Sequence, residues 1–272
     1  MLSEKLNFAK RESQVGELSA KTNDQVRERQ HSGSDGTGIK TGYKEFDLST
    51  GGWNPTDLVL LAGRPAMGKT ALALNMAVNT ASLGTPTAIF SMEMSEIQVI
   101  KRIQSTWFAV NHDKVLLEKV EADKLQEMDE DERFSKLPMY IIDEAGIEIH
   151  NLRARIITLV KKRGVKVVFI DYLQLINGVN PERPRENINI QIRYYTKTLK
   201  AIAKELNITI VLLSQLSRKV DERSKGIPRL SDLRDSGEIE QDADRVILAY
   251  RPEYYKVKKT EPIGSDNAIF SR

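Results

Sequence analysis

The chain has 272 residues, of which 40% are hydrophobic and 29% are charged, and its formal net charge is +3. This composition is typical of a globular protein, and the length allows one large core with an appendage. The absence of cysteine excludes disulfides, thiolate metal sites and cysteine nucleophiles, and suits a reducing cytoplasm. No apolar run approaches the roughly 20 residues of a membrane span, so we expect no membrane partner. Because the net charge is small, nucleic-acid binding would require local basic patches.

Residues 1–31 are polar and charged, with scattered apolar side chains at Leu2, Leu6, Phe8, Val15, Leu18 and Val26. Such a segment can form a helix, but without a continuous apolar stripe the helix would not be stable alone. Residues 32–38 then read Ser-Gly-Ser-Asp-Gly-Thr-Gly, which is the composition of a flexible linker. We therefore expect an arm and linker at 1–38 and one compact domain at 39–272. The arm either docks on another surface or is a disordered tail.

Within the compact domain, short apolar runs alternate with helical patterns. The expected strands are residues 58–62, 87–92, 139–143, 166–171, 207–214 and 245–250. The expected helix faces are formed by Ile97, Ile100, Ile103, Trp107 and Val110, by Leu152, Ile156 and Val160, and by Ile192, Tyr195, Leu199, Ile202 and Leu206. Strands that are apolar on both faces, separated by amphipathic helices, predict an α/β fold with a mostly parallel central sheet and helices on both faces.

Residues 63–70 read Gly-Arg-Pro-Ala-Met-Gly-Lys-Thr and match the phosphate-binding loop G-x4-G-K-[ST]. The loop lies between an apolar strand pattern and an alanine-rich helix pattern, which makes an incidental glycine turn the weaker interpretation. We expect Gly63 and Gly68 to let the backbone curl so that its N–H groups point at phosphate oxygens. Lys69 should reach the β- and γ-phosphates, and Thr70 should ligate Mg²⁺. The predicted nucleotide-binding residues are Gly63, Ala66, Gly68, Lys69, Thr70 and Ala71.

Polar residues at the strand ends are further candidates, because ligands of parallel sheets bind beyond the carboxyl ends of the strands. Asp171 ends a buried strand in the Walker B pattern, and a carboxylate there favours a Mg²⁺ ligand. Glu93 is either the base that activates the attacking water or a solvated glutamate at a helix start. Gln215 could sense the γ-phosphate, although polar residues end many strands. Asp143 we treat as structural.

Two basic segments follow these strands. Residues 214–234 directly follow the candidate sensor and carry Arg218, Lys219, Arg223, Lys225, Arg229 and Arg234. Residues 177–187 follow Asp171 and contain Arg183 and Arg185. Basic loops beside a γ-phosphate sensor suit a protein that grips nucleic-acid phosphates, whereas charge runs are more often solvated faces. Because aromatic residues are few in both, we expect phosphate contacts more than base stacking.

Over residues 39–255 the chain resembles the C-terminal motor domain of the replicative DNA helicases of the DnaB family. The resemblance rests on these segments: Thr41-Gly-Tyr-Lys-Glu-Phe-Asp47, Thr50-Gly-Gly-Trp53, the phosphate loop, Phe90-Ser-Met-Glu-Met-Ser95, Ile170-Asp-Tyr-Leu-Gln-Leu175, Leu213-Ser-Gln-Leu-Ser-Arg218, and the run from Ser231 to Asp244. The last three are far more specific than a phosphate loop alone. The resemblance implies a RecA-like P-loop NTPase fold preceded by a linker helix.

The resemblance also implies functional roles. Glu93 takes the place of the catalytic glutamate, Arg102 matches an arginine of the nucleotide site, Asp171 is the Walker B carboxylate, and Gln215 is the sensor. The residues implied to hold single-stranded DNA are Arg234, Asp235 and Gly237, with Arg218, Arg223, Arg183 and Arg185 as further candidates. Family members form hexameric rings, use ATP and Mg²⁺, translocate 5′ to 3′ on DNA, and work with a primase and a loader at the replication fork in the cytoplasm. The arm at 1–31 resembles the linker helix that contacts the neighbouring subunit.

Two family features do not appear in this sequence. The N-terminal collar domain is absent, and so is the Lys-x-Arg-Asn-Gly-Pro-like segment whose basic residues reach the next subunit's γ-phosphate. Because an arginine finger is worth orders of magnitude in rate, we expect this chain alone to bind nucleotide but to hydrolyse and unwind poorly. The alternatives to a helicase motor are a RecA-like filament-forming ATPase on DNA and a nucleotide-binding fragment without unwinding activity.

Overall fold

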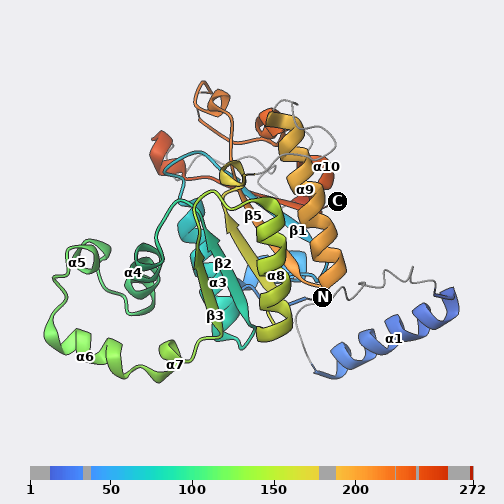
Figure 1. Ribbon diagram of the computed structural model, residues 1–272, viewed down its shortest axis with the longest axis horizontal. Coiled ribbons are helices and arrows are strands. Elements are labelled where there is room, and N and C mark those ends of the chain that lie inside the picture. The colour runs from blue at the N-terminus through green and yellow to red at the C-terminus, as the bar shows by residue number, and fades with distance from the viewer. Residues whose placement is uncertain are drawn as a thin grey trace, which may run out of the picture.

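The computed structural model describes residues 13–32, 38–177, 188–223, 225–236, 239–256 and 270–271. Its centre is a seven-stranded sheet in the order β3-β2-β4-β5-β1-β6-β7 (Figure 1). The strands are β1 (Leu58–Gly63), β2 (Thr87–Ser91), β3 (Met139–Asp143), β4 (Val167–Asp171), β5 (Thr209–Gln215), β6 (Arg245–Ala249) and β7 (Phe270–Ser271). All neighbours pair in parallel except β6 and β7. The predicted parallel α/β sheet is confirmed with all its expected strands, and the short β7 is an addition.

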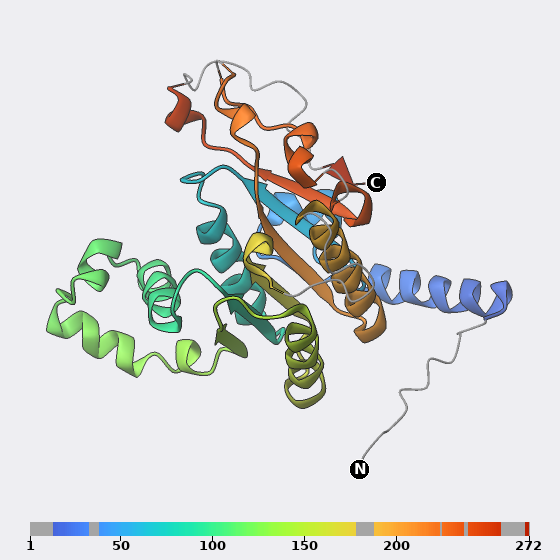
Figure 2. The ribbon, with the colours of Figure 1, turned by 45° about the horizontal axis from the view of Figure 1, so that its top comes forward.

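Helices lie on both faces of the sheet (Figures 1 and 2). The α-helices are α1 (Val15–Ser32), α2 (Lys44–Thr50), α3 (Lys69–Ser82), α4 (Glu96–Trp107), α5 (His112–Leu116), α6 (Ala122–Glu130), α7 (Glu132–Ser135), α8 (Ile149–Arg163), α9 (Ile188–Leu206) and α10 (Ile239–Asp242). Short 3-10 helices are η1 (Leu173–Leu175), η2 (Arg218–Val220), η3 (Leu230–Ser236) and η4 (Pro252–Tyr255). Among the described residues, no helix combines the length and apolarity that crossing a membrane requires.

Alternate residues of the central strands build two separate cores, because successive side chains of a strand point to opposite faces. In β1, Leu58 and Leu60 join the core under α8 and α9, whereas Val59 and Leu61 join the core under α3 and α4. All four side chains are fully buried. Burial on both faces explains why the strands read as continuous apolar runs rather than alternating ones.

The expected apolar face of α4 is only partly correct. Ile103 is buried, but Ile97 is 57% exposed, and Val99, which we did not include, is buried. The expected set was spaced mostly by three residues, and each such step falls about 60° short of a full helical turn. The four-residue spacing from Val99 to Ile103 stays on one side of the helix, so it marks the true buried face.

Helix α1 extends away from the sheet (Figure 2). Its apolar side chains Val15, Leu18 and Val26 are 80%, 50% and 45% exposed, respectively. This agrees with a helix that lacks a self-sufficient apolar stripe. Residues 1–12 and 33–37 of the expected arm and linker lie outside the described residues, and docking of the arm remains a prediction.

Trp53 fixes the segment before β1 to the core. Its side chain is fully buried, its indole N–H donates a 3.1 Å hydrogen bond to the Thr80 hydroxyl, and its ring meets Phe169 edge-on with centroids 5.8 Å apart. Nearby, the buried Asp47 carboxylate accepts hydrogen bonds of 2.9 and 2.7 Å from the backbone N–H and hydroxyl of Thr41. Three of the motif residues between 41 and 53, namely Thr41, Asp47 and Trp53, therefore have structural roles.

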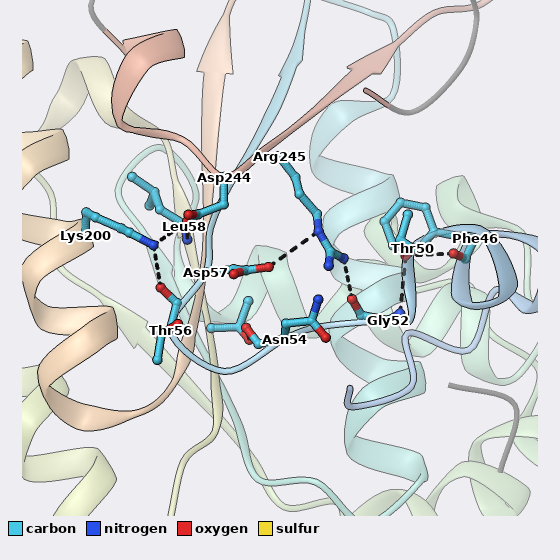
Figure 3. Close-up of polar contacts among 11 residues, drawn as sticks. Phe46, Thr50, Gly52, Asn54, Thr56, Asp57, Leu58, Lys200, Asp244 and Arg245 are labelled. Carbon is cyan, nitrogen blue, oxygen red and sulfur yellow. Dashed lines mark hydrogen bonds and ion pairs between the residues drawn. The ribbon is translucent and has the colours of Figure 1, made fainter. Parts of the chain in front are cut away.

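A charged network lies at the amino edge of the sheet, where β1 and β6 begin (Figure 3). Lys200 of α9 donates to the Thr56 carbonyl at 2.8 Å and to Asp244 Oδ2 at 2.5 Å. The same Asp244 oxygen accepts the backbone N–H of Leu58 at 2.7 Å. Beside it, Nε of Arg245 lies 3.4 Å from Asp57 Oδ2. Burial raises the pKa of Asp57, and the charge of Arg245 offsets part of that rise. Through Lys200 the network attaches α9 to the residues just before β1 and β6.

Candidate functional site

The carboxyl ends of β1, β2, β4 and β5 meet at the opposite edge of the sheet. Parallel pairing sets Gly63 beside Gln215 at the ends of β1 and β5. It sets Ser91 beside Asp171 at the ends of β2 and β4. Because β4 and β5 are themselves neighbours, residues that are distant in the sequence gather at this edge. This is where a parallel sheet binds its ligands.

The two glycines of the phosphate loop serve different needs. Gly68 has φ 81° and caps α3 in the left-handed conformation, and a Cβ added there would meet only open space. Ala66 is also left-handed, with φ 65°. Gly63, in contrast, has no positive φ, and a Cβ there would lie 3.2 Å from Cβ of Ala249. The curl that we expected from both glycines comes from Gly68 and Ala66, whereas Gly63 allows close packing against β6.

Thr70 and Asp171 form the centre of the site. The Thr70 hydroxyl donates a 2.8 Å hydrogen bond to Asp171 Oδ2. The Asp171 side chain is buried, and its Oδ1 has no hydrogen-bond partner within the described protein. Burial raises the pKa of Asp171, and the Thr70 hydrogen bond and the Lys69 charge offset that effect only in part.

These two residues fit Mg²⁺. A buried carboxylate oxygen without a partner is costly unless a cation compensates it. Mg²⁺ prefers oxygen ligands, and it commonly takes only one or two from protein while phosphates and water supply the rest. In keeping with this, the described residues include no group of three or more His, Cys, Asp or Glu side chains that could hold a metal alone. Thr70 and Asp171 therefore suit a magnesium ion that arrives with a nucleotide.

Lys69 lies beside this pair at the start of α3. Burial lowers its pKa, while the negative charges of Asp171 and Glu93 act to raise it. Its Nζ lies 5.3 Å from the centroid of the Tyr172 ring. A half-buried ammonium at a helix N-terminus is well placed to bind an anionic phosphate, which would compensate its partly lost hydration.

A cavity of about 430 Å³ lies over the phosphate loop. It is lined by Arg64, Pro65, Ala66, Gly68, Lys69, Thr70, Ala71, Glu93, Arg102, Tyr172 and Gln215. The structure thus brings the predicted Glu93, Arg102 and Gln215 to the phosphate loop from the turn after β2, from α4 and from β5. Asp143, which we treated as structural, accepts the backbone N–H of Glu96 at 3.1 Å and helps to start α4.

Arg64 and Tyr172 were not among the predicted site residues, although both line the cavity. Arg64 occupies a variable position of the phosphate-loop pattern, and Tyr172 directly follows the Walker B aspartate. The sequence signal for both residues was that each lies next to a predicted site residue. Position in the sequence does not show whether the side chain points into the cavity.

The basic segment after Gln215 is folded against itself. Arg218 and Lys219 are exposed, whereas Val220, which follows them, is buried. Arg223 instead binds inside the segment, to the Asp232 carboxylate and to the Ile227 carbonyl. The exposed cations suit phosphate contacts, whereas Arg223 has a structural partner. DNA binding by Arg218 and Arg223 remains a prediction.

The other predicted DNA-binding residues cannot be placed in the same way. Arg183, Arg185 and Gly237 lie outside the described residues, and of Arg234 and Asp235 only the backbone, in η3, is described. Their roles remain predictions from the resemblance.

Comparison with known proteins agrees with this geometry. The family model of the DnaB-like helicase C-terminal domain matches residues 38–270. The chain belongs to this family. It is 41% identical over 245 residues to the replicative DNA helicase DnaB of Rickettsia prowazekii, and 37% identical over 258 residues to the replicative DNA helicase DnaC of Bacillus subtilis. Those alignments cover 84% and 91% of this chain.

Two solved structures share the fold. One is an ATPase domain that superposes with a TM-score of 0.81 at 31% identity, covering 90% of this chain and 86% of that one. The other is a DnaB-like replicative helicase, solved in a study of its interactions with primase, which gives a TM-score of 0.78 at 30% identity, with coverage of 94% and 60%. The predicted RecA-like fold and family are confirmed. The chain spans about half the length of the curated relatives, 49% and 54% for the two named above.

Proposed function

We propose that this chain is the ATP-driven motor part of a replicative DNA helicase. The observation that carries the proposal is the hydrogen bond between Thr70 and the buried Asp171, next to a cavity that Glu93 and Gln215 also line. A nucleotide-binding protein needs only the phosphate loop. A carboxylate from the turn after β2 and an amide from the end of β5 both line the cavity over that loop, which supports coupled hydrolysis rather than binding alone.

In this proposal the phosphate loop binds the triphosphate. Backbone N–H groups at the start of α3 and the Lys69 ammonium would bind the phosphates, and Arg102 lies across the same cavity. Thr70 and Asp171 would hold Mg²⁺. When bound, such an ion would neutralise part of the negative charge of the phosphates.

Glu93 is proposed as the general base. Its carboxylate lies on the cavity beyond the end of β2, where it can accept a proton from the attacking water. The water oxygen bonds to the γ-phosphorus as the bond to the β–γ bridging oxygen breaks, and that oxygen leaves with ADP. Gln215, from the neighbouring part of the same cavity, is positioned to respond to the presence of the γ-phosphate.

The partners follow from the proposed motor role. Single-stranded DNA would contact the segment after Gln215, where Arg218 and Lys219 are exposed. A homohexamer joined through the exposed helix α1, and work with a primase and a loader at the cytoplasmic replication fork, are parts of the same proposal. The solved relative studied with primase supports the primase component.

The test is ATP hydrolysis and strand separation by the chain, with and without single-stranded DNA. We expect slow hydrolysis that DNA stimulates, and weak unwinding of a forked duplex that occurs only when the loading tail has the 5′ polarity. Glu93→Gln should abolish hydrolysis, while Glu132→Gln on the distant α7 should not. Hydrolysis by Glu93→Gln at the unmodified rate would contradict the assignment of the base. Filaments on DNA would favour a RecA-like filament ATPase, and nucleotide binding without unwinding would favour a binding module.

A further inference from the structure

Arg64 connects the phosphate loop to the segment that follows Gln215. Its Nε and one terminal nitrogen donate hydrogen bonds of 2.9 and 2.7 Å to Asp221 Oδ2. Its other terminal nitrogen donates a 2.9 Å bond to the carbonyl of Leu216. These three bonds use three of the five N–H donors of the guanidinium group. A single side chain thus holds both the residue after the sensor and the carboxylate at the far end of η2.

The same carboxylate is held from the other side by the chain that follows β6. The Tyr255 hydroxyl donates a 2.8 Å hydrogen bond to Asp221 Oδ1. Its ring also covers Gly226, where an added Cβ would lie 2.2 Å from a ring carbon. Nearby, the Tyr250 hydroxyl donates to the Lys225 carbonyl at 2.6 Å. The segment from 216 to 226 is therefore fixed between the phosphate loop and η4.

We propose that Arg64 is a positioning residue that ties the conformation of the phosphate loop to that of the basic segment at 216–226, so that a bound nucleotide controls the grip on DNA through Asp221. The proposal rests on the proposed motor function. It differs from the sensor role of Gln215, because it acts through the nucleotide-binding loop itself rather than through a residue that faces the γ-phosphate.

The placement of the group supports this role. Arg64 lines the nucleotide cavity while its side chain is only 14% exposed. A bound phosphate and the Asp221 carboxylate are both strong acceptors for a guanidinium, so a nucleotide in the cavity must change the balance between them. Any shift of Asp221 moves η2, whose Arg218 and Lys219 are exposed. The Arg64 hydrogen bond is the main cause that lowers the pKa of Asp221, in agreement with their direct contact.

The competing explanation is that the contact between Arg64 and Asp221 only stabilises the fold. In that case, breaking the contact would lower the stability of the protein but would not change the nucleotide dependence of DNA binding. The discriminating quantity is therefore the ratio of two dissociation constants for one labelled oligothymidylate, measured with and without a non-hydrolysable ATP analogue. A true coupling between two sites typically amounts to a factor of about 5 to 150 in such a ratio.

The variants are Asp221→Asn, Tyr255→Phe and Arg64→Lys in the full chain, with Glu132→Gln as the matched loss of an exposed ion-pair carboxylate. We expect the ratio for Asp221→Asn and Arg64→Lys to fall about fivefold or more toward one. Asp221→Glu should restore part of it, and the control should match the unmodified chain. An unchanged ratio in both Asp221→Asn and Arg64→Lys would overturn the proposal.

Tryptic cleavage after Arg218, Lys219, Arg223 and Lys225 separates failure of this proposal from failure of the proposed function. The hydrogen bonds between Arg64 and Asp221 hold the segment even without a ligand. Because proteolysis follows local opening of the chain, trypsin should cleave Asp221→Asn at these sites several-fold faster than the control variant. Equal cleavage rates for Asp221→Asn and the control would show that the contact between Arg64 and Asp221 does not hold the segment. If the unmodified chain bound neither nucleotide nor DNA, the motor function would fail, while faster cleavage of both Asp221→Asn and Arg64→Lys would still establish that the contact between Arg64 and Asp221 holds the segment.

Discussion

Thr70 and Asp171 share a 2.8 Å hydrogen bond although they are 101 positions apart in the sequence. The bond joins the first turn of α3 to the end of β4, and among the described residues the buried Asp171 Oδ1 has no hydrogen-bond partner. The protein therefore holds the two side-chain oxygens that we propose as Mg²⁺ ligands in place in the absence of a cation. Such preorganisation lowers the reorganisation that binding would otherwise require.

Replacing Asp171 with Asn should remove the response to Mg²⁺ without unfolding the chain. The Asn oxygen can still accept the Thr70 hydroxyl, but the carboxylate that attracts the cation is gone. At 100 times its dissociation constant, a nucleotide stabilises a protein by about 2.7 kcal/mol. We expect the unmodified chain to show such a gain with ATP and Mg²⁺ in thermal melts, and Asp171→Asn to lose most of it. A retained gain would contradict the assignment of Asp171 to the metal.

The pH dependence of the unliganded protein gives a second check on Asp171. A carboxyl whose folded pKa is raised destabilises the fold when it is ionised, so stability increases as the pH falls through the folded pKa toward 3.8, its ordinary value. Asn carries no such charge. Unliganded Asp171→Asn should therefore be at least as stable as the unmodified chain at pH 7, and its advantage should shrink as the pH falls. Denaturant titrations at several pH values measure this difference.

Replacing Glu93 with Gln should separate nucleotide binding from hydrolysis. Gln has nearly the same shape but cannot accept a proton from water. Removal of a general base typically lowers the rate by a factor of about 10² to 10⁴. We expect ATP hydrolysis to fall by this factor while the affinity for a fluorescent ATP analogue changes little. A large loss of affinity would instead indicate that Glu93 acts mainly in binding.

The grouping of the residues at the proposed nucleotide site was predictable from sequence, because each of them has a local signal. The phosphate loop is one continuous pattern, and Asp171 is a charge at the end of a fully apolar strand. Parallel pairing then brings these ends together without further information. The contact of Arg64 with Asp221, 157 residues away, has no comparable signal. It depends on how η2 folds back over the loop, which tertiary packing decides.

The faces of exposed helices were the least predictable feature. In α9 the expected Ile192, Tyr195 and Leu199 are all buried, because that helix lies along the sheet and has a complete apolar stripe. In α4, by contrast, Ile97 is exposed, since the position of the helix relative to the sheet determines which part of a broad apolar face is covered. Periodicity identifies a helix more reliably than it identifies the buried side.

Replacing Trp53 with Ala should destabilise the fold strongly. The side chain is fully buried, contacts Phe46 and Phe169, and donates to Thr80. Loss of a large buried aromatic side chain costs about 3–5 kcal/mol. Urea denaturation followed by far-UV circular dichroism measures this cost. Trp107→Ala is the control, because that side chain is only partly buried, and we expect a clearly smaller loss. Equal losses of unfolding free energy in the two variants would show that Trp53 stabilises the fold no more than Trp107 does.

Replacing Lys200 with Met should weaken the attachment of α9 to the start of β1. Met keeps the length of the side chain, but the Thr56 carbonyl loses a donor and Asp244 loses its cation. Removing one partner from a buried polar pair typically costs about 1–3 kcal/mol, and the partial exposure of this pair favours the lower end. Urea denaturation at pH 7 should show this loss. The double variant Lys200→Met with Asp244→Asn should lose less than the sum of the two single variants, because the charge left unpaired in Lys200→Met is then absent. Strictly additive losses would show that the two residues do not stabilise the fold as a pair.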